Sequence, residues 1–251
     1  MKEFTVLTAC YNNKIYLKDW MDSVLLQTYR PLSVVFVDDN SSDESFDYIN
    51  DCKKNFINKD IHIVLHKNTE RQYCASSYAK ALSLSSSYYL GVLDADDLLI
   101  KGAVEDICSV YKKYNFGHIY TQFCFIKENL EFWKFGFSKH PGKNNSLLDA
   151  GLSKIHAYSH WRTFTRKSPD IYKIFKKGMR SNVDKYMGYT LEEIYDGGFY
   201  NKTLYKYRVR KNSISKTEPS MQLWRELVTF FKNKRKADNI KIYPIKAIPV
   251  D

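Results

Sequence analysis

The stretch YLGVLDADD, residues 89–97, joins a short apolar segment directly to a run of acidic residues. Two earlier segments, FTVLTA at 4–9 and SVVFV at 33–37, are equally apolar and rich in β-branched residues. Uninterrupted apolar runs of this length are typical of strands buried on both faces of a parallel sheet. Ligands of such sheets bind beyond the carboxyl ends of the strands. The sequence therefore predicts an α/β fold with a ligand site at the acidic end of 89–97.

Helical segments separate these strands. Between the first two, apolar residues recur at the spacing of one helix face, which predicts a helix over 14–28 and a parallel βαβ unit. The alternation continues less regularly, and the further expected elements are helix 44–55, strand 61–65, helix 74–86, strand 88–93, helix 102–114, strand 117–126, helix 183–196 and strand 203–209. The polar turn 38–45 is expected to cap the helix that follows it.

The composition fits one large core and excludes several classes of protein. Of the 251 residues, 44% are apolar and 16% are aromatic, which argues against general disorder. No uncharged apolar stretch of about 18 residues occurs, and the N-terminus lacks the pattern of a signal peptide, so we expect a cytoplasmic protein. The formal net charge is +11, and its excess of Lys and Arg lies after residue 100, which suggests a surface there for nucleic acid, anionic lipid or a phosphorylated ligand.

Asp94 and Asp96 have the spacing that lets two carboxylates face one divalent cation. Mg²⁺ and Mn²⁺ prefer such oxygen ligands and are usually held by one or two carboxylates together with substrate phosphates. An Asp-rich turn that caps the next helix would have the same sequence. Asp38 and Asp39 follow an earlier strand, so two acidic clusters are expected at the same edge of the sheet.

Three motifs occur in order along the first half: LTACYNN at 7–13, VFVDDNSSDES at 35–45 and YLGVLDADD at 89–97. Together with NVDKYMGYTLEEIYDGGFYNKTLYKYRVRKNSIS at 182–215, they make the chain resemble the inverting glycosyltransferases of family 2, which have the GT-A fold. The resemblance implies a Rossmann-like, mixed but mainly parallel central sheet flanked by helices. It also implies a catalytic domain at 1–216, with a nucleotide-binding half at 1–100 and an acceptor-binding half at 101–216, and a C-terminal helix and tail at 217–251.

The resemblance gives roles to residues of the first half. The residues that would contact the nucleotide of a donor, with a UDP-sugar favoured, are Thr8, Ala9, Tyr11, Asp39, Asp94 and Ala95. The Asp39 carboxylate would accept a hydrogen bond from the base. Asp94 and Asp96 would bind Mn²⁺ or Mg²⁺, whose charge offsets the negative charge that grows on the leaving nucleoside diphosphate.

Asp184 matches the acidic position at which the family has its general base. It would take the proton of an acceptor hydroxyl while that oxygen attacks the anomeric carbon, so that the sugar is inverted in a single displacement. The family often has two acidic residues here, whereas this chain has Val183 before Asp184. Asp184 could instead be an acid in the first turn of a helix, favoured by the helix dipole. Glu192 and Glu193 are the fallback candidates for the base unless they simply face solvent.

The chain departs from the family pattern at two further places. Tyr78-Ala79 stands where an Arg-Asn pair is common, and Arg71 is the candidate to supply a cation near the diphosphate, unless it is a solvated loop residue. Arg210 stands where a metal-binding histidine is frequent. Arginine cannot bind a metal because it stays protonated, but its guanidinium can pair with a diphosphate, so we expect a weaker dependence on metal.

The segment IHAYSHWRTFTRK, residues 155–167, concentrates aromatic and basic side chains. Such groups suit sugar rings and phosphates, so His160 and Arg162 are candidates for contacts with the acceptor or with the donor phosphates. His156 and His160 lie four residues apart and would instead suggest a metal site, but no third ligand is close to them in the sequence.

Residues 219–236, PSMQLWRELVTFFKNKRK, have the pattern of a basic amphipathic helix. Such a helix can lie on the cytoplasmic face of a membrane as a peripheral contact. Alternatively, its apolar face packs on the catalytic domain and its cations are solvated. A homodimer is also left open, and the tail at 237–251 has no interpretable pattern.

These features together predict a metal-assisted inverting glycosyltransferase that transfers a sugar from a nucleotide sugar to a hydroxyl of a glycan or lipid-linked glycan, as in polysaccharide biosynthesis. One alternative is a basic nucleic-acid-binding protein, although no groove-reading or strand-reading motif occurs and no nucleic acid partner is expected. Another is an inactive relative that only binds nucleotide sugar. A nucleotidyltransferase would need a Gly-rich phosphate loop where Thr8-Ala9-Cys10-Tyr11 stands, which disfavours that class.

Overall fold

The computed structural model of the chain describes residues 2–153, 157–210 and 218–250. The first half alternates strands and helices in the order β1 (Phe4–Cys10), α1 (Lys14–Leu25), β2 (Leu32–Asp38), α2 (Ser45–Asp51), α3 (Lys53–Ile57), β3 (Ile61–Lys67), α4 (Tyr73–Leu84) and β4 (Tyr89–Val92). β1 pairs in parallel with β2 and β4, and β2 pairs in parallel with β3. The predicted parallel βαβ unit is present.

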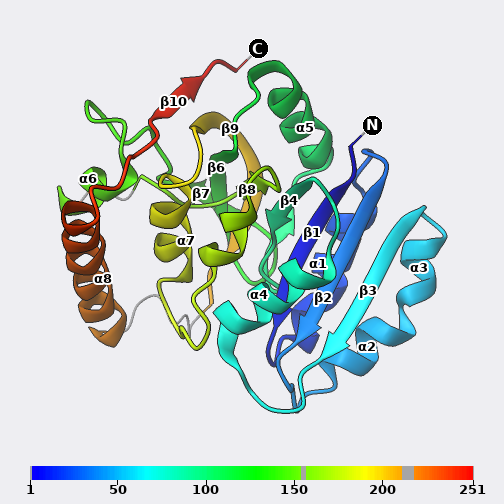
Figure 1. The fold of residues 1–251 in the computed structure, drawn as a ribbon. Coiled ribbons are helices and arrows are strands. Elements are labelled where there is room, and N and C mark those ends of the chain that lie inside the picture. Colours follow the sequence, from blue (N-terminus) through cyan, green and yellow to red (C-terminus); the bar gives the residue numbers. More distant parts are fainter. Residues whose placement is uncertain (1, 154–156, 211–217, 251) are drawn as a thin grey trace.

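The second half extends the same sheet. Its elements are β5 (Leu98–Leu99), α5 (Ala103–Tyr114), β6 (His118–Ile126), β7 (Phe132–Phe135), α6 (Leu147–Leu152), β8 (Arg162–Thr165), the 3-10 helix η1 (Pro169–Ile174), α7 (Val183–Leu191), β9 (Gly197–Arg208), α8 (Glu218–Ala237) and β10 (Ile245–Ile248). The strand order is β10-β9-β6-β8-β4-β1-β2-β3, with β5 beside β9 and β7 beside β6. Figure 1 shows the sheet between helices, with α8 at the opposite end from α2 and α3. The predicted fold class is confirmed.

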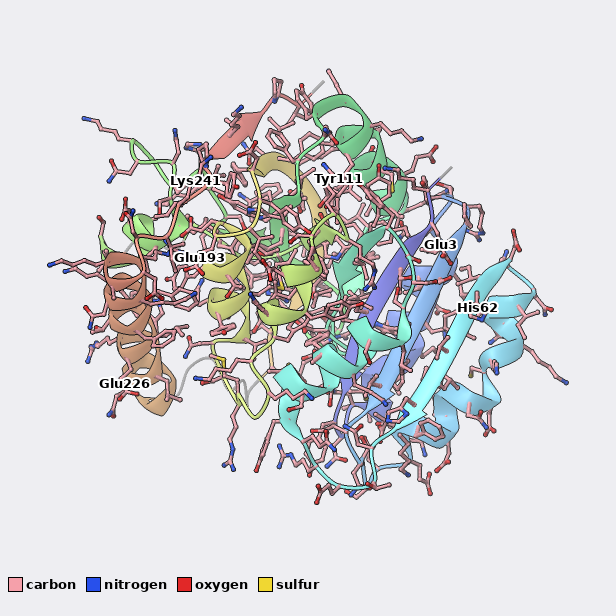
Figure 2. All side chains as sticks on the ribbon, in the orientation of Figure 1. Glu3, His62, Tyr111, Glu193, Glu226 and Lys241 are labelled. Carbon is pink, nitrogen blue, oxygen red and sulfur yellow. The ribbon has the colours of Figure 1, made fainter. Side chains whose placement is uncertain are left out.

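Both faces of the sheet are buried, as the uninterrupted apolar runs predict. Along β2, Val34 and Phe36 belong to one apolar core, whereas Val35 and Val37 belong to a second core on the other face. Helix α1 packs Trp20 into the first core, and α4 packs Tyr78 into the second. Figure 2 shows side chains filling the space between the sheet and these helices. The strands therefore offer their carboxyl ends, rather than a face, to a ligand.

The direction of β8 brings distant residues to that edge. β8 lies between β4 and β6 and is antiparallel to both, with Val92 opposite Arg162. Because of this direction, the start of β8 lies at the carboxyl end of β4, where the acidic run begins. Arg162 and the residues before it thereby reach Asp94, although 68 residues separate the two in the chain.

The expected boundaries are wrong at two helices. The helix expected at 44–55 is divided into α2 and α3, which meet at Cys52. The helix expected at 183–196 ends at Leu191, because β9 starts at Gly197 rather than at 203 and pairs with β6. A Cβ at Gly197 would lie 2.3 Å from Nε2 of His118, so glycine allows this close pairing. The pairing of β9 with β6 from Gly197 onward therefore limits the length of α7, although residues 192–196 have a helical pattern.

The polar turn 38–45 caps a helix that precedes it as well as the one that follows. Asp43 accepts hydrogen bonds from the backbone N–H of Lys14, the first residue of α1, and from that of Ser45, the first residue of α2. The Ser45 hydroxyl accepts from the backbone N–H of Asn13. The turn thus fixes the start of α1 beside the end of β2, where the first two motifs meet.

Helix α8 packs on the domain by one face. Val228 and Phe231 are buried in the second core, whereas Leu223 and Phe230 are about half exposed. This agrees with the packing interpretation for the buried part of the apolar face. Figure 2 shows Glu226 on the outer side of the helix. In the part of the chain that the structure describes, no helix has the length and apolar character needed to cross a membrane.

The basic end of α8 is not fully solvated, contrary to expectation. Arg235 is buried, and its guanidinium donates to Glu192 at 2.8 Å, to Glu193 at 2.9 Å and to the carbonyl of Tyr189 at 2.7 Å. Glu192 is fully buried and also accepts from the backbone N–H groups of Leu147 and Leu148. The suggestion that Glu192 faces solvent is therefore wrong. These carboxylates join α6, α7 and α8.

We expect Arg235→Ala to lower the free energy of unfolding by about 3–5 kcal/mol, because it leaves the buried Glu192 carboxylate without its charged partner. Urea unfolding followed by circular dichroism measures this change. Arg225→Ala is the matched control, since Arg225 lies on the same helix and is exposed. Equal midpoints for both variants would show that the Arg235–Glu192 pair does not stabilise the fold.

Candidate active site

Two cavities open at the carboxyl ends of β1, β2 and β4. One has a volume of about 280 Å³, and its lining includes Ala9, Tyr11, Asp39, Arg71, Asp94, Ala95, Asp96 and Arg210. The other has a volume of about 560 Å³, and its lining includes Asp94, His160, Arg162 and Asp184. Cys74, Asp94, Arg180 and Tyr207 line both, so the cavities form one cleft. We call them the nucleotide-side cavity and the base-side cavity.

The cleft brings together the predicted site residues with one exception. Thr8 does not belong to the lining of either cavity. It is fully buried, and its hydroxyl donates to the carbonyl of Leu93 at 2.9 Å. Thr8 therefore joins the end of β1 to the residue immediately before Asp94. Through this hydrogen bond, the buried Thr8 side chain helps to fix the position of Asp94.

Asp94 is held by donors on two elements. Tyr78 of α4 donates its hydroxyl to one carboxylate oxygen, and Arg162 at the start of β8 donates to the other at 2.9 Å. Arg162 is buried and also donates to Nδ1 of His160 at 3.0 Å. Burial, reinforced by the charge of Arg162, lowers the pKa of His160 well below its ordinary value. The imidazole is therefore neutral and accepts a hydrogen bond from Arg162 through Nδ1.

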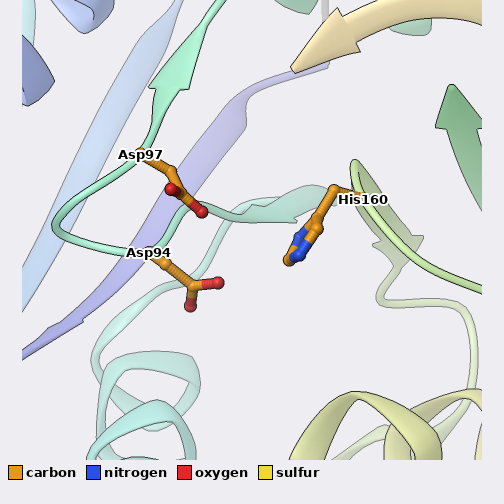
Figure 3. A group of neighbouring side chains, drawn as sticks. All are labelled: Asp94, Asp97 and His160. Atoms are coloured by element: carbon orange, nitrogen blue, oxygen red, sulfur yellow. The ribbon is translucent and has the colours of Figure 1, made fainter. Parts of the chain in front are cut away.

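Figure 3 shows Asp94, Asp97 and His160 pointing toward one another. One ligand atom of each lies within 4.8 Å of the others, which is a geometry that could hold a metal ion. Asp97, however, already accepts from the Tyr205 hydroxyl at 2.8 Å and from the backbone N–H of Arg208 at 2.7 Å. Burial raises the pKa of Asp97 well above its ordinary value, and the nearby Asp96 adds to this. Asp97 therefore joins the acidic run to β9 through hydrogen bonds inside the protein.

Asp96 and Arg210 form an ion pair in the lining of the nucleotide-side cavity. Nε of Arg210 lies 2.7 Å from a carboxylate oxygen of Asp96, and another nitrogen of the same guanidinium donates to Asn13 at 3.0 Å. Burial raises the pKa of Asp96, and the charge of Arg210 opposes that shift. Asp94 and Asp96 both line this cavity, and carboxylates are the type of ligand that Mg²⁺ and Mn²⁺ prefer. Arg210 supplies a second positive charge at the same place.

Asp39 is buried at the base of the nucleotide-side cavity and holds the loop that follows β3. It accepts from Asn68 at 2.8 Å, from Ser77 at 3.1 Å, and from the backbone N–H groups of Gln72 and Tyr73 at 2.8 and 2.7 Å. Only the Tyr73 bond is on Oδ2. Oδ1 accepts the other three bonds, so Oδ2 is the oxygen better able to accept a further donor from a ligand.

Two arginines lie over aromatic rings beside this cavity. The Arg71 guanidinium lies 3.8 Å from the centre of the Tyr11 ring, and that of Arg180 lies 4.1 Å from the centre of the Tyr73 ring. Both are exposed, and both line the cavity. Stacking orients a guanidinium without neutralising it. These arginines thus present positive charge to an anionic ligand.

Asp184 lies in the first turn of α7 and lines the base-side cavity. Its side chain is 31% exposed, and Nζ of Lys185 lies 3.6 Å from its carboxylate. Burial raises the pKa of Asp184, but the charges of Lys185 and Arg162 more than offset this, so the net shift is downward. The carboxylate is therefore ionised at neutral pH. Glu192, the fallback candidate for the base, is sealed in the α8 network away from this cavity.

Several residues of the cleft were missed in the sequence. Arg180 follows an irregular segment that carries no recognisable pattern, and Tyr207 lies in a stretch with the pattern of an ordinary strand. Tyr78 was noted only as a departure from the family pattern, yet it binds Asp94 directly. The early part of the 155–167 motif, including His156, lies outside the described residues, as does 211–215 at the end of the fourth motif.

Known proteins resemble this chain in sequence. Glycosyltransferase GlyA from Streptococcus pneumoniae is 26% identical over 238 residues, which cover 85% of this chain and 32% of GlyA. The chain therefore spans about a third of the length of that relative.

Solved structures resemble this chain in fold. S. aureus TarS 1–349 in complex with UDP-GlcNAc matches with a TM-score of 0.72 at 16% identity, covering 92% of this chain and 66% of that one. Mannosyltransferase PcManGT from Pyrobaculum calidifontis, in complex with GDP-Man and Mn²⁺, matches with a TM-score of 0.64 at 17% identity, covering 95% of this chain and 65% of that one. At these identities the likeness establishes the GT-A type of fold.

The sequence profile described as glycosyl transferase family 2 matches residues 5–172, which include the first three motifs and most of the cleft. The chain belongs to glycosyl transferase family 2.

Proposed function

We propose that this chain is an inverting glycosyltransferase that transfers a sugar from a UDP-sugar to a hydroxyl of a glycan, either free or lipid-linked. The observation that carries the proposal is the position of Asp94. It lines the nucleotide-side cavity together with Asp39 and Asp96, and it lines the base-side cavity together with Asp184. A donor whose diphosphate lies at Asp94 would have its sugar beside an ionised carboxylate.

The nucleotide would lie between the ends of β1 and β2. Oδ2 of Asp39 can accept a hydrogen bond from the N–H of a uracil, and Tyr11 offers a ring face beside it. Asp94 and Asp96 would hold a Mn²⁺ or Mg²⁺ ion, whose positive charge offsets the charge that develops on the leaving diphosphate. Arg71, Arg180 and Arg210 add to that positive field.

The reaction would be a single displacement at the anomeric carbon. Asp184 takes the proton of the acceptor hydroxyl as its oxygen bonds to that carbon. The bond from the carbon to the diphosphate oxygen breaks, and its electron pair leaves with UDP. Attack from the face opposite the leaving group inverts the configuration. The downward pKa shift of Asp184 keeps the base ionised, as this role requires.

The other candidate functions have less support. A cavity of about 280 Å³ with converging polar groups suits a small ligand better than a nucleic acid strand. Three arginines of the basic second half, Arg162, Arg208 and Arg235, are also buried in ion pairs and are therefore not available to bind nucleic acid. An inactive relative would have no need for an ionised carboxylate opposite the acidic run.

Asp184→Asn tests the assignment of the base. We expect it to lower kcat for sugar transfer by about 10²–10⁴-fold, because the amide cannot take the acceptor proton. UDP affinity measured by calorimetry should be unchanged, since Asp184 does not line the nucleotide-side cavity. Asp196→Asn is the control, because Asp196 is exposed outside the cleft. A near-normal kcat for the Asp184 variant would remove Asp184 from the mechanism.

Lys185→Met tests the electrostatic environment of the base. The positive charge of Lys185 stabilises the Asp184 carboxylate and lowers its pKa, so its removal should raise that pKa. We expect the acid limb of the pH profile of kcat/KM to move to higher pH, with activity lost earlier as pH falls. Lys173→Met, at an exposed position on η1, is the control. An unchanged acid limb would contradict the assigned role of Lys185.

Calorimetric titration of UDP with Mn²⁺ and with a chelator tests the phosphate side. We expect tighter binding with Mn²⁺, and residual binding in chelator because Arg210 remains. Asp96→Ala should remove the gain from Mn²⁺, and Arg210→Ala should weaken binding in chelator by about tenfold. Lys206→Ala is the control, because Lys206 lies on β9, just before Arg210 in the chain, and does not line the nucleotide-side cavity. Equal wild-type affinities with Mn²⁺ and with chelator would argue against the metal at Asp94 and Asp96.

A further inference from the structure

A third cavity of about 330 Å³ adjoins the base-side cavity. His160, Asp184, Lys185, Phe137 and Tyr207 line both. Half of the remaining lining is aromatic, and this remainder comprises Phe123, Phe125, Trp133, Lys134, Ser159 and Val209. The nucleotide-side cavity shares only Tyr207 with it. A molecule in this aromatic cavity would therefore reach Asp184 without occupying the nucleotide-side cavity.

A bulge in the β6–β7 hairpin aims Trp133 into the aromatic cavity. Phe125 lies opposite Lys134 and Ile126 lies opposite Phe132, so Trp133 is an extra residue in β7. A bulge bends its strand and changes the direction of a side chain. As a result, Trp133 and its neighbour Lys134 both line the cavity. Phe132 instead contacts Phe135, with ring centres 5.2 Å apart, and neither lines the cavity.

The aromatic lining is preorganised by contacts between its rings. Phe125 lies 5.9 Å from Trp133 and 6.1 Å from Phe137 between ring centres, and Phe137 lies 5.3 Å from Phe123. Gly136 makes this packing feasible, because a Cβ there would lie 2.5 Å from the Phe123 ring. Trp133 and Phe137 are nevertheless half exposed. They present large apolar surfaces that their own packing does not cover.

We propose that the aromatic cavity binds the acceptor and that the acceptor unit held there is a saccharide whose ring lies against Trp133 and Phe137. This rests on the proposed function, because Asp184 is the group that connects the cavity to the reaction. A sugar ring has apolar C–H faces for aromatic surfaces and hydroxyl edges for polar groups. Ser159, His160 and Lys185 provide such polar groups beside the rings.

The polar part of the lining favours a saccharide over a hydrocarbon chain. Lys134 lies 4.4 Å from the centre of the Trp133 ring and 5.2 Å from that of Phe125, so its charge stands at the aromatic surface. A lipid chain in the cavity would remove water from Lys134, Lys185 and Asp184 without replacing its hydrogen bonds, which is costly. Saccharide hydroxyls can replace those bonds. The cavity is thus suited to the sugar end of an acceptor, whatever that sugar is attached to.

The test compares Trp133→Ala with Phe132→Ala, which removes a neighbouring exposed ring on the other side of the hairpin. The probes are methyl glycosides and disaccharides of common hexoses and N-acetylhexosamines, added to the UDP-loaded full chain. Saturation-transfer NMR measures their binding. We expect wild type and Phe132→Ala to bind at least one probe equally, and Trp133→Ala to bind it about tenfold more weakly. Trp133→Phe should recover most of the loss.

Calorimetry of UDP and thermal unfolding of each variant separate the possible failures. If UDP binds and all variants unfold alike, but Trp133→Ala binds the probes as wild type does or wild type binds none, the saccharide cavity is overturned. Trp133-dependent binding of dodecyl-chain micelles without binding of saccharides would overturn it in favour of a lipid. If UDP itself fails to bind while the Trp133-dependent binding of saccharides persists, the proposed donor is wrong and the saccharide cavity stands.

Discussion

Arg162 donates to Asp94 at 2.9 Å inside the cleft, with its side chain only 7% exposed. A buried guanidinium needs a charged partner, and a buried pair that loses one member leaves a costly unpaired charge. This ion pair therefore fixes the start of β8 against the end of β4. It also sets His160, which accepts from the same guanidinium. Asp94 lines both the nucleotide-side and the base-side cavity, so this contact fixes the position of one cavity relative to the other.

The sequence predicted the parts of the fold that follow local rules. The apolar runs of β1, β2 and β4 and the helical spacing over α1 required only a buried sheet with crossover helices. Acidic residues after β2 and β4 had to meet, because parallel strands end at one edge. The pairing of β8 with β4 was beyond reach, because no periodicity reports which strands are neighbours or that one of them is reversed. For the same reason Tyr78 and Arg162 could not be placed on Asp94 from the sequence.

The charge of the sequence predicted the structure less well than its apolar pattern did. The basic excess of the second half suggested a single interaction surface, yet its arginines have different roles. Arg162, Arg208 and Arg235 are buried and paired with carboxylates, and Arg235 anchors α8 through Glu192. Arg180 and Arg210 instead line the cleft. A count of charges cannot distinguish these cases, since the sequence does not show which cations meet carboxylates from distant segments. The burial of Glu192 was unpredictable for the same reason.

The β6–β7 hairpin differs from the rest of the cleft in how it is attached. β7 joins the sheet through β6 alone in the described strand pairing, and all four of its residues are exposed. Substitutions in β7 disturb few buried contacts, whereas changes at Asp94 or Arg162 break a buried network. The sequence of β7 can therefore change without loss of the buried network around Asp94. The surface beside Asp184 can thus vary while the ion pair between Arg162 and Asp94 is kept.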